Sequence, residues 1–359
     1  MTPLTLIYLL AGLLLLALGA ESLIRGAAQI AERLGISSLV IGLTVVAFGT
    51  SAPELAVSVQ ASLSGSGDIA VGNVIGSNIA NILLILGLAA LLAPLMVARQ
   101  LIRLDVPVMV AAGALTLVLA WDGRISRGDG CMLLAGMLLY ALFLLMAGKR
   151  QQRLALNGRA ESERGPASAP GGWLRHIFLV LMGLGLLVLG SQLLIEGAIS
   201  LARALGLSEL VIGLTVVAVG TSLPELATSL LALYRGERGI AVGNVVGSCV
   251  LNLLLVLGAS AVVVPEGLSI SPNALAFDLP VMFAVFVACI PIFFTGYRIN
   301  RWEGALLLGY YLAYTLYLAM LSTGLPAIEL LRHVMIWFAM PITGITLAVA
   351  FLRAWKVQR

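Results

Sequence analysis

A long segment of this sequence occurs twice, 171 residues apart. Residues 40–56 read VIGLTVVAFGTSAPELA and residues 211–227 read VIGLTVVAVGTSLPELA, so fifteen of seventeen positions are identical. A second pair of blocks, AVGNVIGSNIANILLILG and AVGNVVGSCVLNLLLVLG, follows at the same offset. Each first block carries one carboxylate, Glu54 or Glu225, inside an otherwise apolar stretch. Such a chain is expected to fold as two related halves that place the two glutamates at equivalent positions.

Composition places these halves in a lipid bilayer. The sequence is 60% hydrophobic and 11% charged, whereas an average soluble domain is about 25% charged. The three cysteines, Cys131, Cys249 and Cys289, form neither a disulfide framework nor a metal motif. The N-terminus lacks the basic start and the cleavage site of a signal peptide, so the first span is expected to be retained. Eleven apolar segments are long enough to cross a membrane, at 3–34, 37–63, 69–93, 103–121, 129–148, 174–204, 208–234, 240–264, 275–296, 301–323 and 328–353.

The spans form two halves of five, followed by one further span. The predicted fold is an all-α polytopic membrane protein. Its parts are a first five-helix repeat at 1–148, a cytoplasmic loop at 149–173, a second repeat at 174–323, and an additional transmembrane helix and tail at 324–359. Because five is odd, the second repeat must enter from the opposite side of the membrane, which gives an inverted-topology repeat.

The distribution of basic residues sets the orientation. If the N-terminus lies outside, seventeen of the 21 lysines and arginines fall on the inner side, as the positive-inside rule requires. We therefore expect a multi-pass protein of the cell membrane, a prokaryotic inner membrane, with an outer N-terminus and a cytoplasmic C-terminus.

Each first block predicts a broken helix with an oxygen-rich face. Pro53 has no N–H, so the helix is expected to break near Gly49. In a bilayer, carbonyls released in this way are tolerated only inside protein or beside a wet cavity. Hydroxyl, carboxylate and carbonyl oxygens are the hard ligands that suit Ca²⁺ or Na⁺. The candidate ligands of the first block are the Ala47 carbonyl and the side chains of Thr50, Ser51 and Glu54, and their repeat mates are Ala218, Thr221, Ser222 and Glu225.

The same residues also fit a capping box. Ser51-x-x-Glu54 and its mate match the signature in which serine and glutamate satisfy the N–H groups at a helix start. Serine alone can make such a cap, whereas a carboxylate near mid-bilayer costs at least about 2.5 kcal/mol on insertion scales. We therefore favour a cation site.

The second block adds neutral polar groups. Ser77 and Asn81 stand at i and i+4 on one helix face, and their mates are Ser248 and Asn252. We interpret these four as further candidate ligands, with small-residue helix packing as the alternative. Asn73 and Asn244 are expected to brace the backbone, while Asp105 and Asp278 fit either a cavity contact or a helix start. No P-loop, GxSxG or HExxH motif is present, so the chain is not expected to be an enzyme.

The motifs GTSAPE with GNVIGSN, and GTSLPE with GNVVGS, resemble the two alpha repeats of the cation/calcium exchanger superfamily. Specifically, they resemble those of its prokaryotic sodium/calcium exchanger-like branch. The resemblance is close over 40–87 and 211–258, and the ten-helix hydropathy agrees over 1–323, whereas the eleventh span departs from it. It implies a central site where broken helices 2, 3, 7 and 8 meet. Members of this branch often carry an aspartate where this chain has Asn252.

This resemblance implies a secondary active cation antiporter that exchanges Ca²⁺ for Na⁺ by alternating access at a site shared by the two glutamates. The alternatives are a cation/proton antiporter of the same superfamily and, less favoured, a cation channel. We expect no cofactor beyond the transported Ca²⁺, Na⁺ or H⁺. The expected partners are inorganic cations and the lipid bilayer, with no nucleic acid; the sequence leaves the oligomeric state open, and a monomer would suffice. The long first helix of each half is the candidate moving part.

Overall fold

The computed structural model of the chain describes residues 3–159, 173–205, 218–325 and 327–358. The helices of the first half are α1 (Pro3–Leu34), α2 (Ser38–Ile41), α3 (Ala47–Thr50), α4 (Ala52–Leu63), α5 (Gly67–Ile79), α6 (Gly87–Leu92), α7 (Val106–Leu119) and α8 (Arg127–Arg159). Those of the second half are α9 (Trp173–Ala204), α11 (Ala218–Gly220), α12 (Leu223–Tyr234), α13 (Arg238–Leu251), α14 (Gly258–Val263), α15 (Leu279–Phe294) and α16 (Arg301–Thr323). The last span consists of α17 (Ile328–Val334) and α18 (Met340–Gln358).

The predicted spans are largely confirmed within the described ranges. Nine helices are long and apolar enough to cross a membrane, and the pair Ser38–Thr50 and Ala52–Leu63 forms a tenth span that bends by 42°. The seventh predicted span is described only from Ala218, where α11 and the apolar helix α12 begin. Its earlier part, 208–217, lies outside the described residues. The chain is therefore a multi-pass helical membrane protein.

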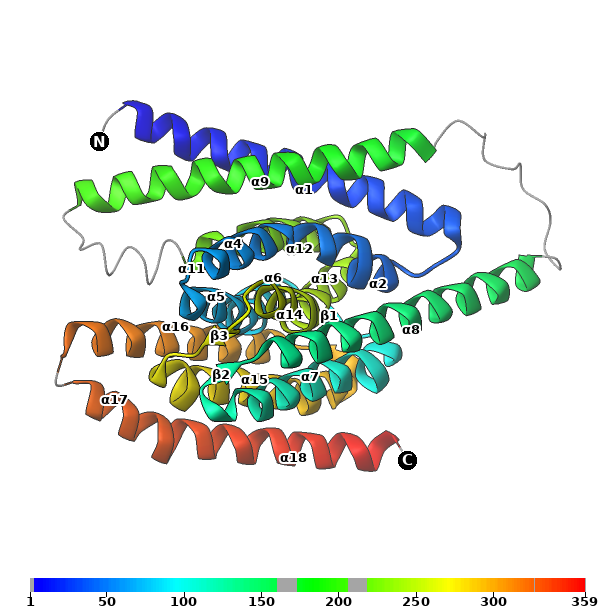
Figure 1. Cartoon of the computed structure of the whole chain (residues 1–359). Helices are drawn as coiled ribbons and strands as arrows, with labels where there is room; N and C mark the ends of the chain where they lie inside the picture. Colours follow the sequence, from blue (N-terminus) through cyan, green and yellow to red (C-terminus); the bar gives the residue numbers. More distant parts are fainter. Residues whose placement is uncertain (1–2, 160–172, 206–217, 326, 359) are drawn as a thin grey trace.

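Helices α1 and α9 pack side by side over one face of the bundle, at the top of Figure 1. Three glycines spaced seven residues apart on each helix form the interface, since any Cβ there would meet the backbone or a side chain of the other helix. At Gly19, for example, a Cβ would lie 2.9 Å from the carbonyl oxygen of Gly183. Small residues at this spacing let membrane helices approach closely without large side chains between them. The six positions are Gly12, Gly19 and Gly26 on α1, and Gly183, Gly190 and Gly197 on α9.

Helices 3 and 8 differ from the predicted form, because neither is broken. Each is one span, Gly67–Leu92 and Arg238–Val263, that changes to π-helical winding in its middle, at Ala80–Leu86 and Asn252–Leu257. Neither span contains a proline, so every residue there keeps an N–H for the helix. A π-helical segment still widens the turn locally, and such segments are frequent at functional sites.

Four two-residue strands tie the halves together and reveal their symmetry. β1 (Leu95–Met96) pairs with β4 (Arg298–Ile299), and β2 (Arg124–Ile125) pairs with β3 (Leu268–Ser269), both antiparallel. β1 and β3 each follow the third span of their own half, and β2 and β4 each follow the fourth span. The two ladders are therefore equivalent under exchange of the halves, as an inverted repeat requires.

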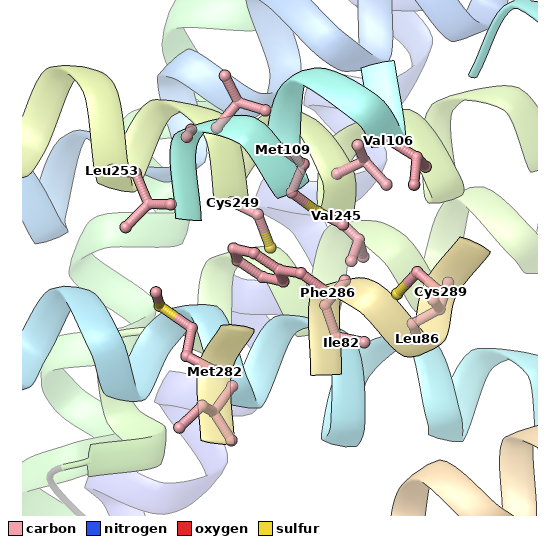
Figure 2. Packing of buried hydrophobic residues seen from close by; sticks show 14 of the residues in the cluster. Ile82, Leu86, Val106, Met109, Val245, Cys249, Leu253, Met282, Phe286 and Cys289 are labelled. Carbon is pink, nitrogen blue, oxygen red and sulfur yellow. The ribbon is translucent and has the colours of Figure 1, made fainter. Parts of the chain in front are cut away.

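The two halves share one apolar core. Phe286 of α15 is fully buried, and Figure 2 shows it among Val245 and Cys249 of α13 and Met109 of α7. Gly113 of α7 makes room for it, since a Cβ there would lie 3.0 Å from the Phe286 ring. Close packing between the fourth helices of both halves makes this core the rigid support of the molecule.

Two segments depart from the ten-helix plan. The helix α8 continues through Arg159, beyond the predicted start of the loop at 149, because residues 149–156 are mostly good helix formers. The last span packs against α15 and α16 of the second half, at the bottom of Figure 1. Tyr310 of α16 donates a hydrogen bond to Thr343 of α18 at 2.8 Å, and the rings of Phe294 and Phe351 lie 4.8 Å apart.

Candidate cation-binding site

The predicted helix break is present in the second span. Helix α3 ends at Thr50, Ser51 adopts a turn conformation at φ −82° and ψ 2°, and α4 begins at Ala52 with Pro53 in its first turn. Proline is well suited to this position because the first N–H groups of a helix have no partner within the helix. The second half repeats the geometry, with Ser222 at φ −92° and ψ 9° before α12. Both breaks direct a new helix start toward the centre of the molecule.

The two glutamates lie in the first turns of these new helices. Glu54 of α4 and Glu225 of α12 are both completely buried, and they are near enough for their charges to interact. Neither takes part in an ion pair within the described part of the chain. Two uncompensated carboxylates inside a membrane protein are costly, so an ionised pair requires cations from outside the protein.

Hydrogen bonds across the halves hold the site together. Ser51 donates to Oε1 of Glu225 at 3.3 Å, so a hydroxyl of the first half serves the carboxylate of the second. Thr50 donates to Oδ1 of Asn244 at 3.1 Å, again between halves. The mate of the first bond is not formed: the Ser222 hydroxyl and both Glu54 carboxylate oxygens have no hydrogen-bond partner among the described residues. The site is thus shared by the halves but not symmetric in detail.

The π-helical segments that carry the predicted amides pack against the two glutamate helices. The segment that begins with Asn252 packs against α4, and the segment that contains Asn81 packs against α12. Each asparagine is fully buried, and its side-chain oxygen and nitrogen have no partner within the described ranges. Ser77 and Ser248, one turn earlier, are buried with unpartnered hydroxyls as well. Buried polar groups are normally satisfied, so this concentration of unsatisfied ones indicates a place for bound ions or water.

The capping-box alternative is not what the structure forms. Neither Ser51 nor Ser222 makes a side-chain capping bond to the helix that follows. Ser51 instead faces Glu225, and the Glu54 carboxylate does not return to the backbone N–H of Ser51. The serines and glutamates of both repeats are therefore available to something other than the helix starts.

Two asparagines on the helices that follow the glutamate helices, α5 and α13, brace the broken spans. Asn73 donates to the hydroxyl of Ser58 at 2.9 Å and to the carbonyl of Glu54 at 3.5 Å. Asn244 repeats both bonds in the second half, to Ser229 at 3.1 Å and to the carbonyl of Glu225 at 3.4 Å. These bonds fit the bracing role predicted for the two asparagines.

The structure adds buried residues that the sequence reasoning passed over. Ser58 and Ser229 are fully buried on the glutamate helices α4 and α12 themselves. Their separation of 171 residues could have indicated them, because it equals the offset of the repeat. The carbonyl of Ala47, predicted as a ligand, accepts the N–H of Ser51 at 3.0 Å and the hydroxyl of Thr50 at 3.3 Å. A bound ion would therefore share that oxygen with, or take it from, the Thr50 hydroxyl.

Other predicted residues are only partly located. Ala218 begins α11 and Thr221 follows it, with the Thr221 hydroxyl unpartnered. Residues 211–217 of the second motif lie outside the described part of the chain.

Asp105 and Asp278 belong to a different pair of sites. Each ends a π-helical segment and accepts a hydrogen bond from a tyrosine of the next helix, from Tyr140 at 3.1 Å and from Tyr314 at 3.0 Å. The structure thus places them at helix junctions that link the fourth and fifth helices of each half.

The central site contains candidate oxygen ligands of three kinds. Carboxylate, hydroxyl and amide oxygens are carried by spans that pack against one another, and the described residues contain no group of three acidic, histidine or cysteine side chains that could hold a metal ion. Oxygen-only sites favour hard cations such as Ca²⁺ and Na⁺ over transition metals. Two carboxylates match the charge of one divalent or two monovalent ions.

Comparison with known proteins identifies the family of the chain. The sequence profile described as "Sodium/calcium exchanger protein" matches residues 4–146 and 175–320. The chain is 40% identical over 314 residues to the putative antiporter CaxA of Alkalimonas amylolytica, covering 86% of this chain and 96% of that one. It is 34% identical to the sodium/calcium exchanger MaX1 of Methanosarcina acetivorans, covering 85% and 96%, and 37% identical to the inner membrane protein YrbG of Escherichia coli, covering 77% and 85%.

Solved structures give the same answer. The chain superposes on the sodium-calcium exchanger NCX_Mj soaked with zero Na⁺ and Ca²⁺ with a TM-score of 0.73 at 33% identity, covering 87% of this chain and 98% of that one. The same protein soaked with 10 mM Na⁺ and 10 mM Sr²⁺ gives a TM-score of 0.71. Repeat, fold and sequence agree that this multi-pass membrane protein belongs to the sodium/calcium exchanger family of cation transporters.

Proposed function

We propose that the chain is a secondary active antiporter that exchanges Ca²⁺ for Na⁺ at one central site, with Glu54 and Glu225 as shared ligands. The observation that carries this proposal is the pair of fully buried carboxylates without any cationic partner in the described part of the protein. The name "sodium/calcium exchanger" borne by MaX1 and NCX_Mj supports Na⁺ as the counter-ion. The remaining ligands are the side chains of Thr50, Ser51, Ser77, Asn81, Thr221, Ser222, Ser248 and Asn252, and the carbonyls of Ala47 and Ala218.

Coupling follows from the charge of the site. The two carboxylates supply a charge of −2, which one Ca²⁺ or two monovalent ions neutralise. A site that holds either load but not both exchanges them by competition. An empty site would have to move two uncompensated charges through apolar surroundings, which is costly. Return without cargo is therefore disfavoured, and ions move only in exchange.

Alternating access requires an element that moves relative to the rest of the protein, and we assign this movement to the α1–α9 pair. The pair lies over the bundle, as Figure 1 shows, and its closest contacts are made through glycines. Gly49, at the break before α4, lies directly against Leu184 of α9. A displacement of α9 would therefore be transmitted to the broken helix that carries Glu54. In the proposed topology the N-terminus lies outside and the C-terminus lies in the cytoplasm, because most basic residues then lie inside.

The proposal is tested by ion flux in proteoliposomes. An imposed Na⁺ gradient should drive uptake of ⁴⁵Ca²⁺, and Glu54→Gln or Glu225→Gln should each abolish it because one charge of the pair is lost. Glu266→Gln, at an exposed glutamate outside the site, is the matched control and should transport normally. Full exchange by both site variants would refute the assignment of the glutamates.

A proton could replace Na⁺ as the counter-ion. The observation that favours this second candidate is the Glu54 carboxylate, whose two oxygens are buried and unpartnered within the described residues. A pH gradient without Na⁺ that drives Ca²⁺ uptake would select it, while Ca²⁺ movement that needs Na⁺ at every pH would select Na⁺. A sustained current without any counter-ion would instead indicate a channel.

A further inference from the structure

A groove separates the last span from the ten-helix unit. It encloses about 960 Å³ between α15, α16 and the helices α17 and α18. The family profile ends at residue 320, so one wall of the groove, α17 and α18, lies beyond the part shared with the family. Among the described residues, no candidate ligand of the central site lines the groove, so the groove is separate from that site.

Its walls are apolar along most of their length. Small residues on the bundle side, such as Ala288 of α15 and Ala313 of α16, face larger ones from the last span, such as Met340 and Leu347. The span touches the bundle through the Tyr310–Thr343 hydrogen bond and the Phe294–Phe351 ring contact. These contacts hold α18 beside the bundle without filling the space between them. A long apolar channel bounded by membrane-spanning helices fits a hydrocarbon chain.

One end of the groove is polar. Asn273, Tyr317 and Arg332 line it near the turn between α16 and α17. Arg332 lies about one turn into the last span and is half exposed, and its contact with Glu329 is 3.4 Å. A guanidinium carries five N–H donors, so Arg332 can keep Glu329 and still bind a phosphate. Guanidinium groups make strong, charge-assisted hydrogen bonds to phosphate oxygens.

We infer that this groove binds one phospholipid molecule, with an acyl chain between α15 and α18 and its phosphate on Arg332. The apolar walls fit an acyl chain and the polar end with Arg332 fits a phosphate, and the two features together select a lipid. In the proposed topology this polar end faces the outer leaflet, so the bound lipid would come from that leaflet. The lipid would complete the packing of the last span, whose helices bury few of their own residues.

The test is a binding titration of the full chain, purified and delipidated in detergent, with dioleoylphosphatidylethanolamine as the probe and native mass spectrometry as the readout. The protein should retain one lipid. Ala313→Phe, which fills the groove, should weaken binding about tenfold, the equivalent of displacing two methylene groups. Arg332→Gln, at an exposed position that should not disturb folding, should weaken binding by up to about fivefold, the loss of one exposed ionic contact.

The matched control is Leu139→Phe on α8. Leu139 is exposed at the position of the first half that corresponds to Ala313, and it does not line the groove. It should bind the lipid like the parent protein. Two results would mean that only loosely associated lipid is present and would overturn the inference. One is equal lipid binding by the parent and all three variants, and the other is a loss of binding in Leu139→Phe as large as that in Ala313→Phe. The outcome does not depend on which ions the central site exchanges.

Discussion

The glycine contact between α1 and α9 makes a quantitative prediction about transport. A Cβ at Gly19 would lie 2.8 Å from the backbone nitrogen of Leu187 and 2.9 Å from the carbonyl oxygen of Gly183, whereas ordinary contacts begin near 3.4 Å. Gly19→Ala must therefore push the two backbones apart by roughly half an ångström or more, and gaps of that size lose a quarter to a half of each contact energy. Overpacking of this kind costs about 1–3 kcal/mol.

We expect Gly19→Ala to slow Na⁺-driven ⁴⁵Ca²⁺ uptake in proteoliposomes by about tenfold or more, because 1.4 kcal/mol added to a barrier is a factor of ten. Ca²⁺ affinity, measured by calorimetry in detergent, should stay within about twofold, since Gly19 does not touch the central site. The double variant Gly19→Ala with Gly190→Ala should be slower still.

Gly185→Ala on α9 is the matched control. Gly185 is exposed, and no described atom lies within 4 Å of the Cβ it would gain. Alanine also favours a helix over glycine by up to about 1 kcal/mol, so this variant should be at least as stable as the parent and transport at the same rate. A Gly19→Ala protein that transports like the control would show that the α1–α9 interface does not move during exchange.

Three further predictions follow from single contacts. Asn252→Asp adds a third carboxylate at a position without competing hydrogen bonds in the described structure, and should raise Ca²⁺ affinity on the order of tenfold in calorimetry because charge count tunes such sites; an unchanged affinity would place Asn252 away from the ion. Asn244→Ala removes three buried hydrogen bonds and should cost about 2–3 kcal/mol of stability, seen as a lower Tm in detergent; an unaltered Tm would argue against the bracing role. Arg235→Gln breaks the ion pair with Glu21. It should change the ratio of the two populations of α1, measured by spin-label distances, by a factor of about 1.4 to 5, equivalent to 0.2–1 kcal/mol. Arg238→Gln should leave the distances unchanged, and an equal change in both variants would assign the effect to net charge.

The sequence predicted the repeat, the spans and the first helix break well. The reason is that each rests on local chemistry: an apolar stretch of membrane length, or a proline that cannot donate an N–H. Pro53 and Gly49 required no knowledge of neighbours to locate the 42° bend. Helices 3 and 8 contain no proline, and the break that the family resemblance implied in each is a π-helical segment instead.

The contacts between the halves could not be predicted in this way. That Ser51 donates to Glu225, and that α4 meets the segment beginning at Asn252, depends on how two halves 171 residues apart dock. The matched offset indicates which residues are equivalent, but equivalent residues need not touch the same partners. The Glu54 carboxylate has no hydrogen-bond partner among the described residues, whereas the Glu225 carboxylate accepts a hydrogen bond from Ser51. This difference results from how the halves dock, which hydropathy and motif spacing do not encode.

An inverted repeat with identical halves would give its outward-open and inward-open states equal energies, so differences between the halves must set the resting state. The charged contact between α1 and the end of α12 is one such difference. Glu21 pairs with both Arg25 and Arg235, whereas the positions 171 residues away from Glu21 and Arg235 are Gln192 and Ser64, which cannot form an ion pair. The contact therefore ties α1 to the bundle on one face of the membrane only. Because the pair is partly exposed, it contributes about 0.2–1 kcal/mol and weakens with salt. That energy biases the equilibrium without locking it, so the mechanism proposed above assigns the larger influence on the direction of opening to the charge of the ions bound at the central site.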